Sequence, residues 1–174
     1  MILLSLDTTA AVATAALFRD GVLLAEREAE AGKKHAETAL PMMEQMLEEN
    51  GVAISQIDCF AVDIGPGSFT GVRIGVSLVN ALAFATGMKI VPVDALRTLA
   101  QSAGEEQRPV CAMIDARNGN AYAALYQAGR EMIAPCAVET SAFVSDLPED
   151  VIYVGDAHAA NASYPRAKDV GLVA

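Results

Sequence analysis

The chain has 174 residues, 53% of them hydrophobic, and a formal net charge of −10 from 12 Lys and Arg against 22 Asp and Glu. This composition is too apolar for a disordered segment. The acidic balance also argues against unaided binding to a nucleic-acid backbone, because that affinity comes from Lys and Arg that displace counterions. The three cysteines show no C-x-x-C spacing, so we expect reduced, packed thiols in a cytoplasmic protein.

Neither a membrane span nor a signal peptide is expected. A span needs ~20 consecutive apolar residues, whereas the longest charge-free run, Ile74 to Met88, is shorter and contains three polar residues. The apolar start, Met1 to Leu6, has no Lys or Arg ahead of it. The excess of apolar residues therefore fills a core or covers an interface with another chain.

The first part of the chain predicts a meander of three strands followed by a helix. Asp20-Gly21 between two strand-like runs is a strong hairpin signal. With Thr38 as the N-cap of the helix, Pro41 falls in the first turn, where its missing N–H costs nothing. A start near Lys34 would instead imply a kink at Pro41. The predicted elements are strands at 2–7, 12–18 and 22–28 and a helix at 38–50.

Beyond Gly51, apolar strands alternate with helices, which predicts an α/β class built from two lobes. The polar segment from Gly104 to Pro109 is rich in breakers, so we place a domain boundary there, between domains 1–104 and 105–174. The segment 157–174 predicts no clear element. The remaining predicted elements are strands at 57–64, 89–93, 110–115, 121–127, 132–138 and 151–154, and helices at 72–86, 94–103 and 141–147.

Asp7, Thr8 and Thr9 directly follow the first apolar strand. Hydroxyls and backbone N–H groups in a tight hairpin can cradle a phosphate, so a weak, vestigial phosphate loop is one interpretation. An Asx or ST turn between two strands accounts for the same three residues. The sequence favours the turn but leaves both open.

A glycine-rich loop, residues 65–71, opens the second long helix. It is not a P-loop, because no Lys follows Gly71, and its spacing differs from the G-x-G-x-x-G fingerprint. Small residues recur every four positions and predict a smooth ridge that another helix could approach closely. Because each interior glycine costs about 1 kcal/mol relative to Ala, the ridge indicates a packing requirement. Its members are Gly67, Gly71, Gly75, Val79, Ala83 and Gly87.

Arg73 is the only charge of this predicted helix and lies in its first turn, where the helix dipole disfavours a cation. It calls for an anionic partner: a surface carboxylate, a bound phosphate or an acidic group on another protein. His35 has Ala39 at i+4, and the other histidine, His158, lies far along the chain. We therefore expect no metal site.

Three methionines form a stripe on the helix predicted at 38–50. Core packing is the usual explanation for such a stripe, but the flexible thioether also suits an adaptable contact surface. Two largely apolar helices from one lobe could form half of an intermolecular bundle. The stripe consists of Met42, Met43 and Met46.

Four motifs along the chain occur in an order that resembles a known family, the TsaB (YeaZ) family of bacterial tRNA threonylcarbamoyladenosine biosynthesis proteins. The longest and most specific is the stretch from Ile64 to Gly75, with its G-P-G-S-F-T-G-x-R-x-G pattern. The resemblance covers Met1 to about Tyr126 and weakens after Gln127. The other motifs are Ser5-Leu6-Asp7-Thr8-Thr9, His35 with Leu40-Pro41, and Ile114-Asp115-Ala116-Arg117 followed by Tyr122.

The resemblance implies an actin-like, Hsp70-like or sugar-kinase-like (ribonuclease H-like) fold of two related lobes. It also implies a non-catalytic subunit that binds the catalytic paralogue TsaD and, with the ATPase TsaE, supports threonylcarbamoyl transfer to adenosine 37 of tRNA. No cofactor of its own, only indirect contact with tRNA, and a homodimer in the absence of TsaD are expected. The expected partner surface consists of Met42, Met43, Met46, Phe69, Gly71, Arg73, Gly75, Leu78, Val79, Leu82 and Ala83.

Members of this family usually continue for several tens of residues past the position of Ala174, so we expect a C-terminal lobe that is either naturally short or truncated. One alternative function is an actin-like-fold, ATP-dependent phosphotransferase that uses Asp7 and Thr8 at the phosphates. Another is the metalloprotease activity after which the glycoprotease family was formerly labelled. The Ala39 that stands where the paralogue has its second histidine argues against a protease.

Overall fold

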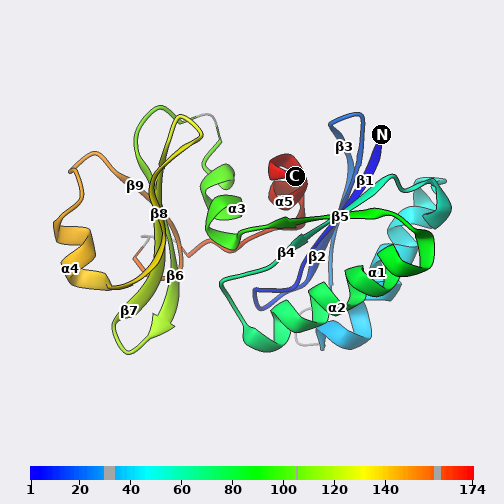
Figure 1. Ribbon diagram of the computed structural model, residues 1–174, viewed down its shortest axis with the longest axis horizontal. Coiled ribbons are helices and arrows are strands. Elements are labelled where there is room, and N and C mark those ends of the chain that lie inside the picture. Colours follow the sequence, from blue (N-terminus) through cyan, green and yellow to red (C-terminus); the bar gives the residue numbers. More distant parts are fainter. Residues whose placement is uncertain (30–33, 105, 159–161) are drawn as a thin grey trace. The chain divides into compact units, whose positions relative to one another are not determined.

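The computed structural model describes residues 1–29, 34–104, 106–158 and 162–174 (Figure 1). The chain forms two compact units. Unit 1 comprises Met1–Ala95 and Arg166–Ala174, and unit 2 comprises Leu96–Pro165. Each unit has one sheet with helices packed against it, so the predicted α/β class is confirmed.

The helices and strands follow the predicted order along the chain. The strands are β1 (Ile2–Asp7), β2 (Thr14–Arg19), β3 (Val22–Glu28), β4 (Cys59–Asp63), β5 (Lys89–Val93), β6 (Val110–Arg117), β7 (Asn120–Gln127), β8 (Arg130–Glu139) and β9 (Ile152–Gly155). The helices are α1 (His35–Glu49), α2 (Phe69–Thr86), α3 (Ala95–Ser102), α4 (Thr140–Ser145) and α5 (Ala167–Val173), with a 3₁₀ turn at Ile54–Gln56.

The sheet of unit 1 has the strand order β3-β2-β1-β4-β5. Asp20 and Gly21 close the β2–β3 hairpin with φ of 52° and 79°, as a type I′ turn requires. Strands β1, β4 and β5 run parallel to one another. Their carboxyl ends therefore meet at one edge of the sheet.

Helices cover both faces of this sheet (Figure 1). Neighbouring side chains of a strand point to opposite faces, so Leu4 packs with α1 and α2 while Leu3 packs with α5. Both leucines are buried. The alternation divides the core of unit 1 into two hydrophobic layers.

Both long helices of unit 1 begin three residues before the predicted start. The backbone N–H of Glu37 and the hydroxyl of Thr38 donate to the carbonyl of Lys34, so α1 begins at His35 and Pro41 lies inside it. Ser68 caps α2 by accepting the backbone N–H of Gly71 at 3.2 Å. The alternative start near Lys34 is thus confirmed for α1, whereas the sequence pattern missed the start of α2 because its first turn carries polar and glycine residues.

The sheet of unit 2 has the order β8-β7-β6-β9, with β6 and β9 parallel. It repeats the pattern of unit 1, in which a three-stranded antiparallel meander is followed by a helix and a parallel strand. Asn118 and Gly119 both have positive φ in the β6–β7 hairpin. The two related lobes implied by the resemblance are present as these two sheets.

The predicted boundary between residues 104 and 105 is wrong. Leu96 and Leu99 of α3 are buried in one cluster with Ala112, so α3 belongs to unit 2. At the other end of the chain, Ala167 and Val170 of α5 are buried in the core of unit 1. The boundary was misplaced because a linker-like composition does not report which core a helix joins.

Polar contacts hold α5 on the sheet of unit 1. The hydroxyl of Ser5 donates to the carbonyl of Ala167 at 2.6 Å, and the N–H of Ala167 donates to the hydroxyl of Thr14 at 2.8 Å. Arg166 forms ion pairs with Glu26, at 2.9 Å, and with Glu28. A segment for which the sequence predicts no element thus completes the core.

Replacing Val170 with Asp tests the contribution of α5. The new carboxylate would be buried without a partner, so the free energy of unfolding should fall by at least about 2 kcal/mol, as measured by urea denaturation. Leu172→Asp on the same helix is the control, because Leu172 is 55% exposed. Equal stability of the two variants would contradict the packing of α5.

Candidate functional site

The carboxyl edge of the unit 1 sheet brings acidic residues together. Leu6 of β1 is paired with Val62 of β4, so the residues that follow them, Asp7 and Asp63, are neighbours. Both are fully buried. Asp94 follows β5 at the same edge. Parallel strand topology thus gathers carboxyl groups that are far apart in the sequence.

Each buried carboxyl group has one satisfied oxygen. Asp7 Oδ1 accepts the backbone N–H of Thr9 at 2.9 Å and its hydroxyl at 2.7 Å. Asp63 Oδ1 accepts the backbone N–H of Gly65 at 2.7 Å. Within the described part of the chain, neither Oδ2 atom has a hydrogen-bond partner. The Asx-turn interpretation of Asp7 to Thr9 is confirmed.

The shared burial shifts the protonation of this pair. Burial raises the pKa of Asp7 to about 6, against the opposing effects of the Thr9 hydrogen bonds and the charge of His35. Burial also raises the pKa of Asp63 well above its usual range, and the nearby Asp7 carboxylate adds to this shift. The pair therefore holds a proton at pH values at which exposed carboxyl groups have lost theirs.

The β1–β2 loop lies in direct contact with the start of α2. The hydroxyl of Thr8 donates to the carbonyl of Gly71 at 2.7 Å, and the N–H of Ser68 donates to the carbonyl of Thr9 at 2.9 Å. A Cβ atom at Gly71 would overlap the carbonyl of Thr8, and one at Gly75 would overlap its hydroxyl. Both glycines are needed because the loop and the helix approach this closely.

The predicted ridge for a partner helix is therefore wrong. The small residues of α2 face the interior of unit 1, because the helix must rest on the loop and the sheet. A residue that is buried within its own chain has no surface to offer a partner. The correction applies to Gly71, Gly75, Val79 and Ala83, all buried.

The methionine stripe of α1 also belongs to the core. Core packing, one of the two interpretations of its spacing, is confirmed, and its assignment to the partner surface is wrong. The helical period places the stripe on the side of α1 that faces the sheet. Met42, Met43 and Met46 are at most 9% exposed and join the cluster formed with α2.

The same contacts bear on the phosphate-loop interpretation. A phosphate oxygen needs free N–H or O–H donors, but the hydroxyls of Thr8 and Thr9 and the N–H of Thr9 already donate within the chain. Residues 7–9 are also buried. These residues do not fit a phosphate in this conformation.

A metal site needs several ligand side chains close together. Among residues 1–29, 34–104, 106–158 and 162–174, no three His, Cys, Asp or Glu side chains are grouped as metal ligands. His35 Nε2 lies 2.9 Å from the carbonyl oxygen of Ala10, and position 39 is a buried Ala. The candidate site thus lies on a surface rather than at the buried carboxyl groups.

Part of the predicted partner surface is accessible. Phe69 is 75% exposed, Arg73 is exposed, and Leu78 and Leu82 are partly exposed. Arg73 lies over the Phe69 ring, 5.4 Å from its centre. These four residues are on α2, on sides of the helix that the ridge does not use.

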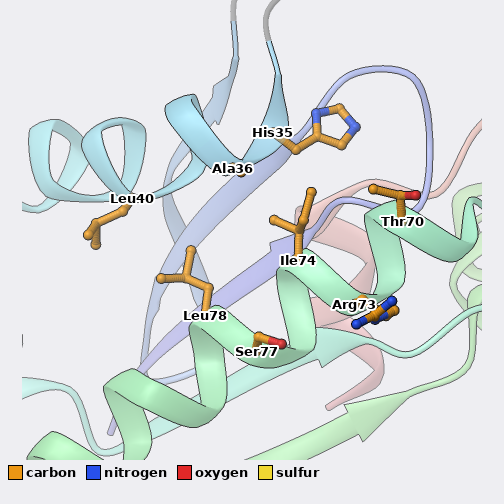
Figure 2. Close-up of a pocket in the computed structure, with 8 residues that line it drawn as sticks. All are labelled: His35, Ala36, Leu40, Thr70, Arg73, Ile74, Ser77 and Leu78. Atoms are coloured by element: carbon orange, nitrogen blue, oxygen red, sulfur yellow. The ribbon is translucent and has the colours of Figure 1, made fainter.

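A groove of about 470 Å³ separates α1 from α2. In Figure 2, Leu40 of α1 and Ile74 and Leu78 of α2 point into the space between the helices. A second hollow of about 380 Å³ continues past Leu40 along the later turns of both helices and reaches Leu82. We refer to the two hollows together as the α1/α2 groove; its first part is lined by His35, Ala36, Leu40, Thr70, Arg73, Ile74, Ser77 and Leu78.

Helix α2 is more apolar than its buried contacts require. By length and composition alone it could cross a membrane, which for a single helix is weak evidence of a span. A core helix passes the same test, and the small residues of α2 do pack in the core. Phe84, however, is 93% exposed. The accessible part of α2 needs another explanation.

Comparisons with known proteins identify the family. Residues 28–167 match the family model described as "TsaD: tRNA N6-adenosine threonylcarbamoyltransferase". The TsaB protein of Escherichia coli is 37% identical over 129 residues, which are 73% of this chain and 55% of that protein. YeaZ from Pseudomonas aeruginosa is 31% identical with a TM-score of 0.80, covering 99% of this chain and 90% of that one. The chain belongs to the TsaB (YeaZ) family.

The membership in the TsaB family confirms the resemblance of the motifs. A more distant likeness, to component A of (R)-2-hydroxyglutaryl-CoA dehydratase from Acidaminococcus fermentans, has a TM-score of 0.52 at 11% identity and shows the fold alone. The chain spans about half the length of the curated TsaB relatives that it matches. The α1/α2 groove therefore lies on unit 1 of a TsaB-family chain.

Replacing Gly71 with Ala tests the close approach of loop and helix. The added Cβ would meet backbone rather than a flexible side chain, so the free energy of unfolding should fall by about 2 kcal/mol or more, measured by urea denaturation. Asn80→Ala is the control because Asn80 is exposed on the same helix, and it should change stability by less than about 0.5 kcal/mol. A Gly71→Ala variant as stable as this control would refute the contact.

The pair Asp7 and Asp63 makes stability depend on pH. Between pH 4 and pH 6 the folded chain keeps a proton that an unfolded Asp7 has lost, because its folded pKa is about 6 against an ordinary 3.8. The free energy of unfolding should therefore fall as the pH rises through this range, by up to about 3 kcal/mol.

Asp7→Asn is the variant that checks this dependence. The amide oxygen can still accept from Thr9, but the buried charge is gone, so the variant should be more stable than wild type at pH 7 and show a flatter pH profile. Glu44→Gln, at an exposed carboxylate, should leave the profile unchanged. An unaltered profile in Asp7→Asn would contradict the buried titration.

Proposed function

We propose that the chain is a non-catalytic subunit of the machinery that makes threonylcarbamoyladenosine at position 37 of tRNA. It binds the catalytic paralogue TsaD through the α1/α2 groove and acts together with the ATPase TsaE. Chemistry takes place on TsaD. The observation that carries this proposal is the accessible apolar groove on two helices of a TsaB-family chain.

The family supports the choice of pathway. Curated relatives in Escherichia coli and Haemophilus influenzae carry the name tRNA threonylcarbamoyladenosine biosynthesis protein TsaB. The family model that matches most of the chain describes the transferase TsaD, so a partner with a related architecture is a natural occupant of the surface.

The surface supports the mode of binding. Leu40 lines both hollows of the groove and is 37% exposed, which places an accessible apolar side chain at its centre. Aligned helices with exposed apolar side chains bury them most effectively against other helices. An apolar patch of this kind on a folded unit marks an interaction site.

The remaining roles follow from charge and hydrogen bonding. A chain of net charge −10 leaves most of the positive surface for tRNA to its partners, so its contact with tRNA is indirect. We place this subunit in the cytoplasm. Because the donors of Thr8 and Thr9 are engaged, the subunit works without a cofactor of its own. In the absence of TsaD the same groove supports a weak, concentration-dependent homodimer.

The two alternatives have less support. A phosphotransferase would need the donors of the β1–β2 loop for its phosphates, and a metalloprotease would need ligands that the described residues do not group together. Neither alternative gives a role to the α1/α2 groove. The accessory-subunit proposal accounts for both the engaged loop and the exposed helices.

Leu40→Glu tests the proposed surface. A charge at the centre of the groove should weaken binding to the TsaD of the same organism by at least about tenfold, which corresponds to 1.4 kcal/mol, in isothermal titration calorimetry. The fold should be retained because Leu40 is already partly exposed. A thermal melt of the variant checks this point.

Met132→Glu provides the matched control. Met132 is 57% exposed on β8 in unit 2, so the same change of charge there should leave TsaD binding unchanged. Equal binding by Leu40→Glu and Met132→Glu would exclude the groove as the docking surface. Absence of binding by the wild-type chain would exclude the accessory role itself.

A further inference from the structure

The α1/α2 groove carries opposite charges at its two ends. Arg73 lines the first hollow, beside the amino-terminal turns of both helices. Glu44 and Glu48 line the second hollow, toward the carboxyl end of α1. Between these ends the lining is apolar, with Leu40, Leu78 and Leu82 on its walls. The groove therefore has a positively charged end and a negatively charged end, with an apolar centre between them.

Arg73 has no acidic partner within the described part of the chain. Its guanidinium instead lies over the Phe69 ring, although the chain has 22 acidic residues. The first turn of a helix is also the place where the helix dipole disfavours a cation. An exposed guanidinium in this position, on an otherwise uncharged helix, gains most from a carboxylate supplied from outside.

The acidic end is similarly open. Glu44 and Glu48 are exposed, and no ion pair joins either of them to another described residue. Glu49, one position further along α1, by contrast forms an ion pair with Arg27. The two glutamates on the groove are thus available to a cation on a partner, while the one outside it is engaged.

We infer that Arg73 at one end of the groove, and Glu44 and Glu48 at the other, set the orientation of the bound partner. The partner helix carries a carboxylate opposite Arg73 and a Lys or Arg opposite the two glutamates. This inference rests on the proposed function and takes TsaD as the occupant. The apolar centre provides most of the buried area, and the charges at the ends discriminate between the two directions of docking.

Net charge disfavours a second copy of this chain as the occupant of the groove. A two-fold axis across the groove would bring Arg73 of one copy near the glutamates of the other, so the local pattern suits self-association. Two chains that each carry a net charge of −10 nevertheless repel one another. A less acidic partner gains the same ion pairs without this penalty.

Charge reversal tests the inference. Arg73→Glu should weaken binding to the TsaD of the same organism by at least about tenfold at low salt, mainly through a slower association rate, and the difference should shrink as salt is raised. The double variant Glu44→Lys with Glu48→Lys should weaken binding in the same way. Surface plasmon resonance at two ionic strengths measures both effects.

Arg130→Glu is the matched control. Arg130 is exposed on β8 in unit 2, so its reversal changes the net charge equally but leaves the groove intact, and TsaD binding should stay within about twofold of wild type. If Arg73→Glu binds as this control does, the inference is wrong while the accessory role stands. If the wild-type chain does not bind TsaD at all, the proposed function has failed instead.

Two further outcomes separate the possible occupants. Single Asp or Glu to Lys changes on the surface of TsaD should include one that restores binding to Arg73→Glu, and failure of every such change would overturn the predicted carboxylate. Sedimentation of the isolated chain measures self-association. If Arg73→Glu weakens only self-association and leaves TsaD binding intact, the occupant is a second copy and the inference is wrong.

Discussion

The close contact between the β1–β2 loop and the start of α2 determines which side of that helix faces inward. Thr8 lies against Gly71 and Gly75 so tightly that neither position accepts a Cβ atom. This contact, with the hydrogen bond from Thr8 to the carbonyl of Gly71, turns the small residues of α2 toward the sheet. Larger apolar residues and Arg73 are left on the accessible sides. The surface that we propose for the partner is therefore a consequence of how the loop is packed.

The buried carboxyl groups of Asp7 and Asp63 contribute to the same arrangement. They hold the turns that follow β1 and β4 by accepting hydrogen bonds from Thr9 and Gly65. This arrangement leaves each buried acid only partly satisfied. Their raised pKa values make unit 1 more stable at mildly acidic pH than at neutral pH. The carboxyl ends of the strands commonly hold a ligand in open α/β sheets, whereas here the hydroxyls of Thr8 and Thr9 donate within the chain. The carboxyl edge of the unit 1 sheet thus supports the start of α2.

The charges at the two ends of the α1/α2 groove suit the proposed accessory role. A subunit that acts through a partner needs a surface that binds in one orientation, and hydrophobic contact alone is non-directional. In the proposed complex, Arg73 and the glutamates of α1 set the direction at the ends of an apolar contact. The acidic balance of the whole chain then favours a less acidic partner over self-association. The proposed partner would thus account for the part of the apolar composition that the core does not use.

Local sequence patterns determined the α/β class, the order of strands and helices, and the family, because hydrophobic period, turn residues and the glycine motif act over short distances. The small residues at positions 71, 75, 79 and 83 also predicted a close contact, but their spacing could not say with what. Only the tertiary structure showed that Thr8 fills that place and that Met42, Met43 and Met46 lie in the core. The return of α5 to unit 1 was equally hidden, since it depends on the hydroxyls of Ser5 and Thr14 more than 150 residues away. Such contacts are set by which surfaces meet after the chain folds.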